Sequence, residues 1–408
     1  MKTEELELYI HIPFCLRKCN YCDFVSAPGT ESEIERYTDA LVKEIKACKE
    51  KYAGFNIRSI YFGGGTPSIL SAGQFTKISD ALHESFNLEG LKDRFSLKKL
   101  SRKPLKREEA EFEELQRKIE FSIECNPATM SGDFKDKIKA WKKAGVNRIS
   151  IGLQSTEKEQ LKVLGRLHSL EDFLDTYEEL RKAGFKNINI DLMQAVPGQN
   201  LSSWKRTLAG VAALKPEHIS AYSLMIEEGT PFEKWYSEKN GIKSVTLSSG
   251  ENFLLPDEDE EREIYYYTKE FLEKCGYERY EISNYALPGY ECRHNTGYWK
   301  RVNYLGLGLN SSSLINDVRW KNTDDTDEYL ANSAEPERIR KEVEELSLND
   351  KMAEFMFLGL RMTRGISKKE FFDDFGQSYD YVYGAVSEKL AAEGLLKETE
   401  AGDDTFVA

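Results

Sequence analysis

The sequence predicts an α/β fold, in which an open, partial (β/α)6 barrel is followed by a smaller α+β C-terminal domain with a winged-helix-like end. From residue 6 to about residue 225, six short β-rich runs alternate with six longer amphipathic segments. This alternation implies parallel strands joined by right-handed crossovers. A closed barrel would need eight strand–helix units, so we expect the sheet to stay open.

The expected elements follow one another at regular spacing. Strands are predicted at residues 6–12, 57–62, 119–123, 148–151, 187–191 and 218–223. Helical periodicity covers residues 33–50, 71–86, 132–143, 157–163, 170–183 and 201–213. In such sheets the carboxyl ends of the strands form the ligand site, and most motifs of interest fall there.

Three domains are expected from a chain of 408 residues. We assign residues 1–230 to the barrel, 231–345 to an α+β extension and 346–408 to the winged-helix-like module. In that module, residues 350–362, 368–375 and 380–393 have helical patterns, and residues 397–408 are expected to form one strand of a wing. The chain ends where a second wing strand would be expected. Acidic side chains offset the module's few cations, which favours capping or protein interaction over nucleic-acid binding.

The composition excludes several classes of protein. A net charge of −13 argues against a general nucleic-acid binder. No run of about eighteen apolar residues is present, and the first residues contain no apolar signal region. We therefore expect a cytoplasmic protein, with peripheral contact at the membrane as the alternative, and no nucleic-acid partner.

A charged segment at about residues 87–118 interrupts the barrel pattern. Its cations are Lys98, Lys99, Arg102, Lys103, Lys106 and Arg107. Charge runs are usually solvated, so a surface insertion is the simpler interpretation. The alternative is a docking arm for an acidic electron donor.

Three cysteines follow the first expected strand at C-x3-C-x2-C spacing, namely Cys15, Cys19 and Cys22. Thiolates this close together suit one soft-metal centre, either zinc or an iron–sulfur cluster. A structural zinc site takes four ligands, and no fourth Cys or His follows at close spacing. Three thiolates on a four-iron cluster would instead leave one iron free for an outside ligand.

Glycines and polar side chains occupy the ends of the following strands. The turn GGGTPS at residues 63–68 lets a ligand approach the backbone, because glycine has no Cβ. Glu124 ends the third strand, where a carboxylate suits a ribose hydroxyl pair. Gln154 and Asp191 end the fourth and fifth strands, and Arg166 offers a fixed cation for a carboxylate. Packing alone does not explain polar groups at successive strand ends.

Together, YIHIPFC (9–15), GGGTPS, LGRLH (164–168), PGQ (197–199) and HNTGYW (294–299) resemble the coproporphyrinogen dehydrogenase-like branch of the radical S-adenosylmethionine superfamily. The His-Asn-x-x-Tyr-Trp element resembles that of the HemW-type heme chaperones. Oxygen-independent coproporphyrinogen oxidases carry a fourth cysteine where this chain has Phe24. Two elements depart from the family pattern: LMQAVPGQ (192–199) replaces LMYGLPGQ, and GLGLNSSS (306–313) replaces G-x-G-x-x-A-H-S.

The resemblance implies a role for each matching residue. Cys15, Cys19 and Cys22 would bind a 4Fe–4S cluster. The S-adenosylmethionine pocket would be lined by Tyr9, Tyr21, Phe24, Gly65, Thr66, Glu124, Gln154, Arg166, Asp191 and Met225. His294 would contact heme and is a candidate iron ligand, since imidazole suits heme iron. Tyr298 and Trp299 would stack on or bury the porphyrin.

Three functions remain open at this point. The first is a heme chaperone that binds heme and delivers it to a respiratory membrane protein, with a flavodoxin- or ferredoxin-like reductant for the cluster. The second is an oxygen-independent coproporphyrinogen III oxidase, which would remove propionate carboxyl groups by radical chemistry. The third is a zinc-stabilised binding protein. Phe24 and the His-Asn-x-x-Tyr-Trp element favour the chaperone.

Overall fold

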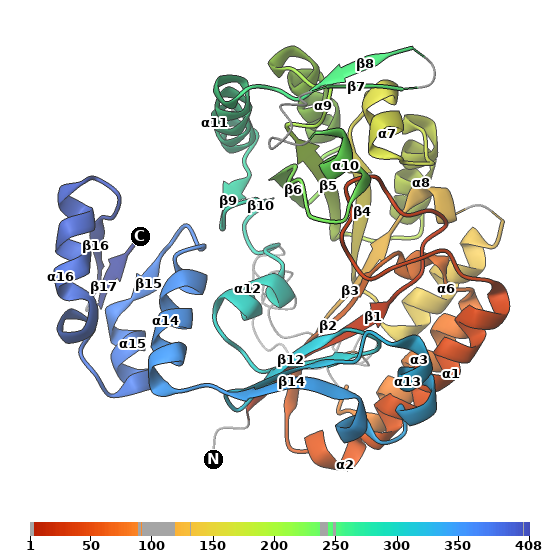
Figure 1. Ribbon diagram of the computed structural model, residues 1–408, viewed down its shortest axis with the longest axis horizontal. Helices are drawn as coiled ribbons and strands as arrows, with labels where there is room; N and C mark the ends of the chain where they lie inside the picture. Colours follow the sequence, from red (N-terminus) through yellow and green to blue (C-terminus); the bar gives the residue numbers. More distant parts are fainter. Residues whose placement is uncertain are drawn as a thin grey trace, which may run out of the picture.

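The computed structural model describes residues 4–88, 91, 119–130, 132–236, 244–247, 250–402 and 404–408. Its centre is a sheet of six parallel strands that follow one another in sequence order (Figure 1). These strands are β1 (Glu5–Ile12), β2 (Asn56–Gly64), β3 (Glu120–Cys125), β4 (Arg148–Gln154), β5 (Ile188–Gln194) and β6 (His218–Ser223). The predicted partial (β/α)6 barrel is confirmed.

Helices cover the outer face of this sheet. They are α1 (Glu31–Ala47), α2 (Lys49–Tyr52), α3 (Ala72–Ser85), α6 (Phe134–Ala144), α7 (Lys158–Leu164), α8 (Leu170–Lys182) and α9 (Leu201–Ala213). Local sequence fixes where several of them begin and end. The Thr30 and Ser71 side chains form capping boxes at the starts of α1 and α3. The glycines Gly145 and Gly165 take the left-handed conformation that ends α6 and α7.

The sheet continues beyond the barrel at both edges. Antiparallel β10 (Asn284–Ala286) and β9 (Glu278–Arg279) extend it past β6. On the other side β11 (Tyr304–Leu307) pairs parallel to β1, followed by antiparallel β12 (Ser312–Ile315), β13 (Val318–Asn322) and β14 (Arg340–Glu345). Most strands of residues 231–345 therefore belong to the barrel's own sheet.

Residues 231–345 also contribute helices and one separate strand pair. The helices are α10 (Pro231–Trp235), α11 (Glu258–Lys274), α12 (Arg293–Trp299) and α13 (Thr326–Asn332), and the pair is β7 (Ser244–Thr246) with β8 (Asn252–Leu254). Helix α12 lies between the barrel and the C-terminal module (Figure 1). It contains the His-Asn-x-x-Tyr-Trp element.

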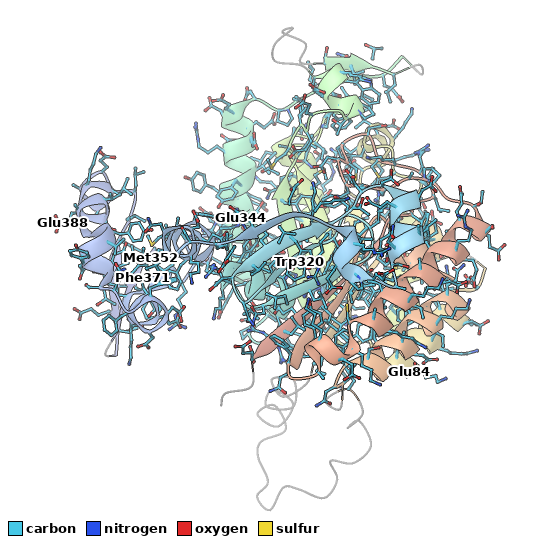
Figure 2. The ribbon with its side chains drawn as sticks, turned by 60° about the horizontal axis from the view of Figure 1, so that its bottom comes forward. Glu84, Trp320, Glu344, Met352, Phe371 and Glu388 are labelled. Atoms are coloured by element: carbon cyan, nitrogen blue, oxygen red, sulfur yellow. The ribbon has the colours of Figure 1, made fainter. Side chains whose placement is uncertain are left out.

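The C-terminal module has its own core and projects from the barrel (Figure 2). Its helices are α14 (Leu348–Gly359), α15 (Lys368–Phe375) and α16 (Tyr379–Ala392), and its strands are β15 (Ile366–Ser367), β16 (Glu398–Ala401) and β17 (Asp404–Val407). Met352, Phe371 and Val407 are buried in its centre. The expectation of a single wing strand over 397–408 is wrong, because this segment turns back and forms the β16–β17 hairpin. Glycine at 402, with φ of 68°, makes the turn possible.

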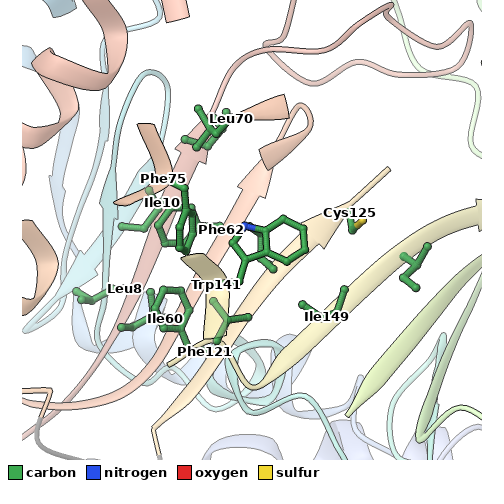
Figure 3. Close-up of a cluster of buried hydrophobic side chains, with 14 of the residues drawn as sticks. Leu8, Ile10, Ile60, Phe62, Leu70, Phe75, Phe121, Cys125, Trp141 and Ile149 are labelled. Atoms are coloured by element: carbon green, nitrogen blue, oxygen red, sulfur yellow. The ribbon is translucent and has the colours of Figure 1, made fainter. Parts of the chain in front are cut away.

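The main core lies between the sheet and its helices. Leu6, Leu8, Ile10 and Ile12 of β1 are fully buried, and Phe62, Phe75 and Phe121 pack together beside Trp141 (Figure 3). Because side chains alternate along a strand, Glu7, Tyr9 and His11 face the opposite side, into the barrel. The barrel interior is therefore polar and aromatic, and it leads to the site described below.

Two sequence predictions remain untested by the fold. The charged insertion at about 87–118 lies outside the described residues, apart from residues 87, 88 and 91. The domain boundaries at 230 and 345 stay predictions.

Among the described residues, no helix is both long enough and apolar enough to cross a bilayer.

Candidate cofactor site

The loop between β1 and α1 brings its three cysteines to one pocket at the carboxyl ends of the parallel strands. Cys15 is buried, while Cys19 and Cys22 are partly exposed. The loop is held from outside: the Asn20 side chain donates to the Val163 carbonyl at 2.8 Å, and Arg17 donates to the Gly165 carbonyl at 2.6 Å. The end of α7 thus fixes the loop across the barrel mouth.

Hydrogen-bond donors face two of the three sulfurs. The Thr66 hydroxyl donates to Cys15 Sγ at 3.3 Å, and the Arg166 guanidinium approaches Cys19 Sγ at 3.7 Å. Such donors stabilise thiolates, the form in which cysteine binds iron or zinc. Burial raises the pKa of Cys22 to about 11, so this thiol keeps its proton near neutral pH, and a metal that binds it would displace that proton. In the ranges that the structure describes, no three His, Cys, Asp or Glu side chains converge closely enough for a single metal ion.

The glycine-rich turn after β2 forms the adjacent wall. A Cβ on Gly65 would lie 2.7 Å from the Phe14 carbonyl oxygen and 3.0 Å from Cys15 Sγ. Gly64 has φ of 108°, which side chains rarely adopt. The turn can therefore approach the cysteine loop because Gly65 has no side chain, and Gly64 supplies the backbone conformation that the turn needs.

Two carboxylates line the pocket from β3 and β5. Glu124 accepts a hydrogen bond from the Tyr61 hydroxyl at 2.9 Å. Burial and the neighbouring Asp191 raise the pKa of Glu124 to about 8. Asp191 accepts from Ser150 at 2.9 Å and from Asn189 at 2.7 Å, and burial raises its pKa too. Two nearby, partly buried carboxylates are suited to accept hydrogen bonds from a ligand's hydroxyl groups.

Two polar side chains in this wall keep groups without hydrogen-bond partners. Arg166 donates to the Gly152 carbonyl at 2.7 Å, and its buried Nε has no partner. Gln154 has φ of 66°, and its buried Oε1 is likewise unpaired. Buried polar atoms are normally satisfied, so these groups indicate a ligand. They lie on the same pocket as the cysteines.

Most of the predicted cofactor residues meet in this pocket. Its lining includes Cys15, Cys19, Cys22, Tyr21, Phe24, Gly65, Thr66, Glu124, Gln154, Arg166 and Asp191. Tyr9 and Met225 are not part of that lining. Tyr9 lines the neighbouring hollow instead, and Met225 is 70% exposed beyond the end of β6.

Sequence reasoning missed Ser150 and Tyr222, which also line the pocket. Ser150 lies two residues before Gly152 on β4, and Tyr222 is near the end of β6. The two-residue period of a strand could have identified Ser150, because it faces the same side as its neighbour at 152.

Helix α12 places the His-Asn-x-x-Tyr-Trp element against the barrel interior. The Glu120 carboxylate on β3 accepts the backbone N–H groups of Arg293 and His294 at 3.1 and 3.3 Å, which caps the helix and opposes its dipole. His294 lies against β2, where its Nδ1 is 2.8 Å from the Ser59 hydroxyl. The sequence did not predict this helix.

The His294 imidazole is 1% exposed, and both of its nitrogens have partners. Its Nε2 lies 3.0 Å from the Tyr298 hydroxyl, and its ring stacks on Tyr61 with centroids 5.0 Å apart. Burial, with the charge of Arg148, lowers the pKa of His294 to about 3, so the imidazole is neutral. In this conformation, iron could bind His294 only if one of these hydrogen bonds were given up. Its heme contact stays a prediction.

The other two residues of the element point in different directions. Tyr298 lines a hollow of about 400 Å³ beside the cofactor pocket, together with Tyr9, His11 and Tyr304. Trp299 instead packs under the Arg361 guanidinium, 4.4 Å from its ring centroid. Of these two aromatic residues, Tyr298 is the one that lines the hollow.

Comparisons with known proteins agree with this geometry. The Radical SAM superfamily model matches residues 9–209, and the HemN C-terminal domain model matches residues 346–402. Heme chaperone HemW of Lactococcus lactis subsp. lactis (strain IL1403) is 35% identical over 389 residues, covering 95% of this chain and 90% of that protein. The Bacillus subtilis (strain 168) protein of the same name is 33% identical, with 96% and 93% covered.

A solved structure extends the comparison to the whole fold. Coproporphyrinogen III oxidase (HemN) from Escherichia coli, described as a radical SAM enzyme, superposes with a TM-score of 0.75. The match covers 99% of this chain and 87% of that chain at 22% identity. At this identity the likeness establishes a common fold.

Proposed function

This chain belongs to the HemW family of heme chaperones in the radical S-adenosylmethionine superfamily, and we propose that it binds heme as cargo and delivers it to a respiratory membrane protein. The proposal depends on one observation, namely that the three-cysteine motif and the His-Asn-x-x-Tyr-Trp element line adjoining cavities. The cysteine pocket and the hollow lined by Tyr298 are neighbours, and both are lined by Phe24 and Gly64.

Cys15, Cys19 and Cys22 would bind the 4Fe–4S cluster that this superfamily implies. The pocket fits such a group, because the three thiols share one lining and two of the sulfurs already face hydrogen-bond donors. When bound, the cluster supplies a one-electron reductant next to S-adenosylmethionine. The free iron of a cluster with three protein ligands would be open to that cofactor's amino and carboxylate groups.

The remaining walls are suited to S-adenosylmethionine. Arg166, with its unpaired Nε, would hold the cofactor's carboxylate. Glu124 would accept the ribose hydroxyls, and Thr66 and Gly65 would contact the amino group. The lining residues Tyr21, Phe24, Gln154 and Asp191 would complete the pocket. Tyr9 and Met225 are the weakest assignments, because neither lines it.

We assign the heme to the side of the barrel where α12 lies. Tyr298 would contact the porphyrin directly, since it lines the hollow. His294 would act from behind it, through the hydrogen bond between its Nε2 and the Tyr298 hydroxyl. Trp299 would bury one edge of the site next to Arg361.

We further propose a cytoplasmic location with peripheral contact at the membrane, where a heme-accepting respiratory protein would be met. A flavodoxin- or ferredoxin-like protein would reduce the cluster. Both partners follow from the chemistry: heme must reach an acceptor, and a low-potential cluster needs an electron source.

Heme transfer tests the proposal. Protein loaded with one heme and freed of excess heme is mixed with a detergent-solubilised, heme-free b-type respiratory subunit, and the absorbance of each partner is followed after separation. Heme should move to the acceptor, faster from cluster-containing protein than from a Cys15→Ala/Cys19→Ala/Cys22→Ala variant. Protein that binds no heme, or that converts coproporphyrinogen III instead, would contradict the chaperone function.

A further inference from the structure

We propose that the porphyrin ring of heme occupies the aromatic hollow lined by Tyr9, Tyr298, Tyr304 and Phe24, directly beside the cofactor pocket. The inference rests on the proposed heme binding and assigns the site. The hollow encloses about 400 Å³, within the range of small-molecule pockets. It lies on the inner face of β1 and β11.

The walls of the hollow suit a flat, apolar ring. Tyr298 and Tyr304 meet edge to face, with centroids 4.7 Å apart and planes at 86°. Two perpendicular rings form a corner in which a planar macrocycle can stack on one ring and meet the edge of the other. Tyr9 backs this corner and is itself stacked on Tyr61 and His294. The aromatic wall is therefore fixed before any ligand arrives.

The hollow also opens towards the cluster. Phe24 and Gly64 line both this hollow and the cofactor pocket. Phe24 is 60% exposed, so it offers apolar surface that a ligand can cover. A porphyrin in the hollow would have one edge against Phe24, within the same cavity system as the cluster.

The polar rim gives the ring an orientation. Asn310, in the turn between β11 and β12, and Ser312, the first residue of β12, provide an amide and a hydroxyl that can donate to the two propionates. Asp23 is the acidic residue of the lining and would repel them. We therefore place the propionates at the Asn310–Ser312 side, facing solvent.

A second cavity in the described part of the chain is larger but less suited to heme. It encloses about 490 Å³ between the cysteine loop, α1 and α13, and charged residues of both signs line it, including Lys18, Arg36, Glu33 and Asp327. It has no residue of α12. Since Val25 is the one residue that lines both cavities, each can be filled without obstructing the other.

Filling each cavity in turn tests the assignment. Ser312→Trp places an indole in the proposed heme site, and the matched control Thr326→Trp places one in the larger cavity, since both positions are exposed residues of their linings. Ser312→Leu is a smaller filler. Heme affinity is measured by absorbance titration. S-adenosylmethionine affinity is measured by calorimetry on the anaerobically reconstituted proteins.

We expect Ser312→Trp to weaken heme binding by about tenfold or more, Ser312→Leu to weaken it less, and Thr326→Trp to leave it within about twofold. S-adenosylmethionine affinity should stay unchanged in all three, which also shows that the barrel is folded. Unaltered heme affinity in Ser312→Trp, or a loss in Thr326→Trp instead, would overturn the assignment. Failure of the wild-type protein to bind heme would instead refute the proposed function.

Discussion

Glu124→Gln should stabilise the cofactor-free protein at high pH while weakening S-adenosylmethionine binding. The pKa of Glu124 is about 8 in the folded protein, against an ordinary value of 4.5. The folded state therefore holds this proton more tightly than the unfolded state. Wild-type stability must fall as the pH rises from about 4.5 to about 8, and glutamine removes this dependence.

The size of the effect follows from the shift. A difference of about 3.5 pH units corresponds to about 5 kcal/mol once the carboxylate is fully ionised. Glu124 is only partly buried, so water in the pocket lowers the free-energy cost of ionising its carboxyl group. We therefore expect about half of the full value, roughly 2–3 kcal/mol of difference in the free energy of unfolding at pH 9. The Tyr61 hydroxyl can still donate to the glutamine oxygen, so the neutral replacement fits.

Urea unfolding of the cofactor-free wild type and Glu124→Gln at pH 5, 7 and 9 measures this difference. The variant should gain stability relative to wild type as the pH rises, and the two should agree at pH 5. S-adenosylmethionine should bind the variant more weakly, because a neutral amide is a poorer acceptor for hydroxyl groups than a carboxylate. A stability difference that is constant from pH 5 to 9 would refute the reasoning.

Three further substitutions test other parts of the site. Gly65→Ala should lower the iron and sulfide content after reconstitution by half or more, because the added Cβ would lie 2.7 Å from a backbone oxygen of the cysteine loop. The control variant Gly54→Ala should keep its cluster, because the added Cβ there has open space around it. Equal iron in both would exclude a steric role for this turn. Tyr61→Phe removes a hydrogen-bond donor to Glu124, so the Glu124 pKa that governs the pH profile of S-adenosylmethionine binding should rise by about one unit. This rise corresponds to about 1.4 kcal/mol of lost stabilisation of the carboxylate. Superimposable pH profiles of the variant and the wild type would count against the hydrogen bond. His294→Ala should weaken heme binding and change the Soret spectrum, and a variant identical to wild type in both would remove His294 from the heme site.

Much of the fold could be predicted because hydrophobic periodicity and local signals agree. The sixth strand has the limits expected from the sequence, residues 218–223. Strands β2, β4 and β5 run three residues further than predicted at most, up to Gly64, Gln154 and Gln194. Their last residues are glycine or polar, which hides the strand pattern, but pairing with neighbouring strands extends them.

Other elements depend on contacts that a sequence does not display. Helix α12 contains a glycine and begins without a capping side chain of its own, since Glu120 from β3 provides the cap. The wing hairpin is an exception, because Gly402 marks its turn in the sequence itself. The pairing of β11 with β1 joins segments almost 300 residues apart, and no local pattern specifies it.

Some residues of the candidate site could likewise be located from the sequence, and others could not. The cysteines, the glycine turn, Glu124 and Asp191 could be located because they lie at or just after the carboxyl ends of strands that the hydrophobic pattern reveals. The burial of His294 could not, because it depends on how α12 packs against Ser59 and Tyr61. The aromatic hollow combines Tyr9 with Tyr304, which come together only when β11 joins the sheet.

The most direct test of the central claim is a heme titration of the anaerobically reconstituted protein, combined with an assay for carbon dioxide release from coproporphyrinogen III. The chaperone function predicts one heme per chain at saturation and no carbon dioxide. Release of carbon dioxide with formation of a divinyl product, or the absence of saturable heme binding, would contradict it.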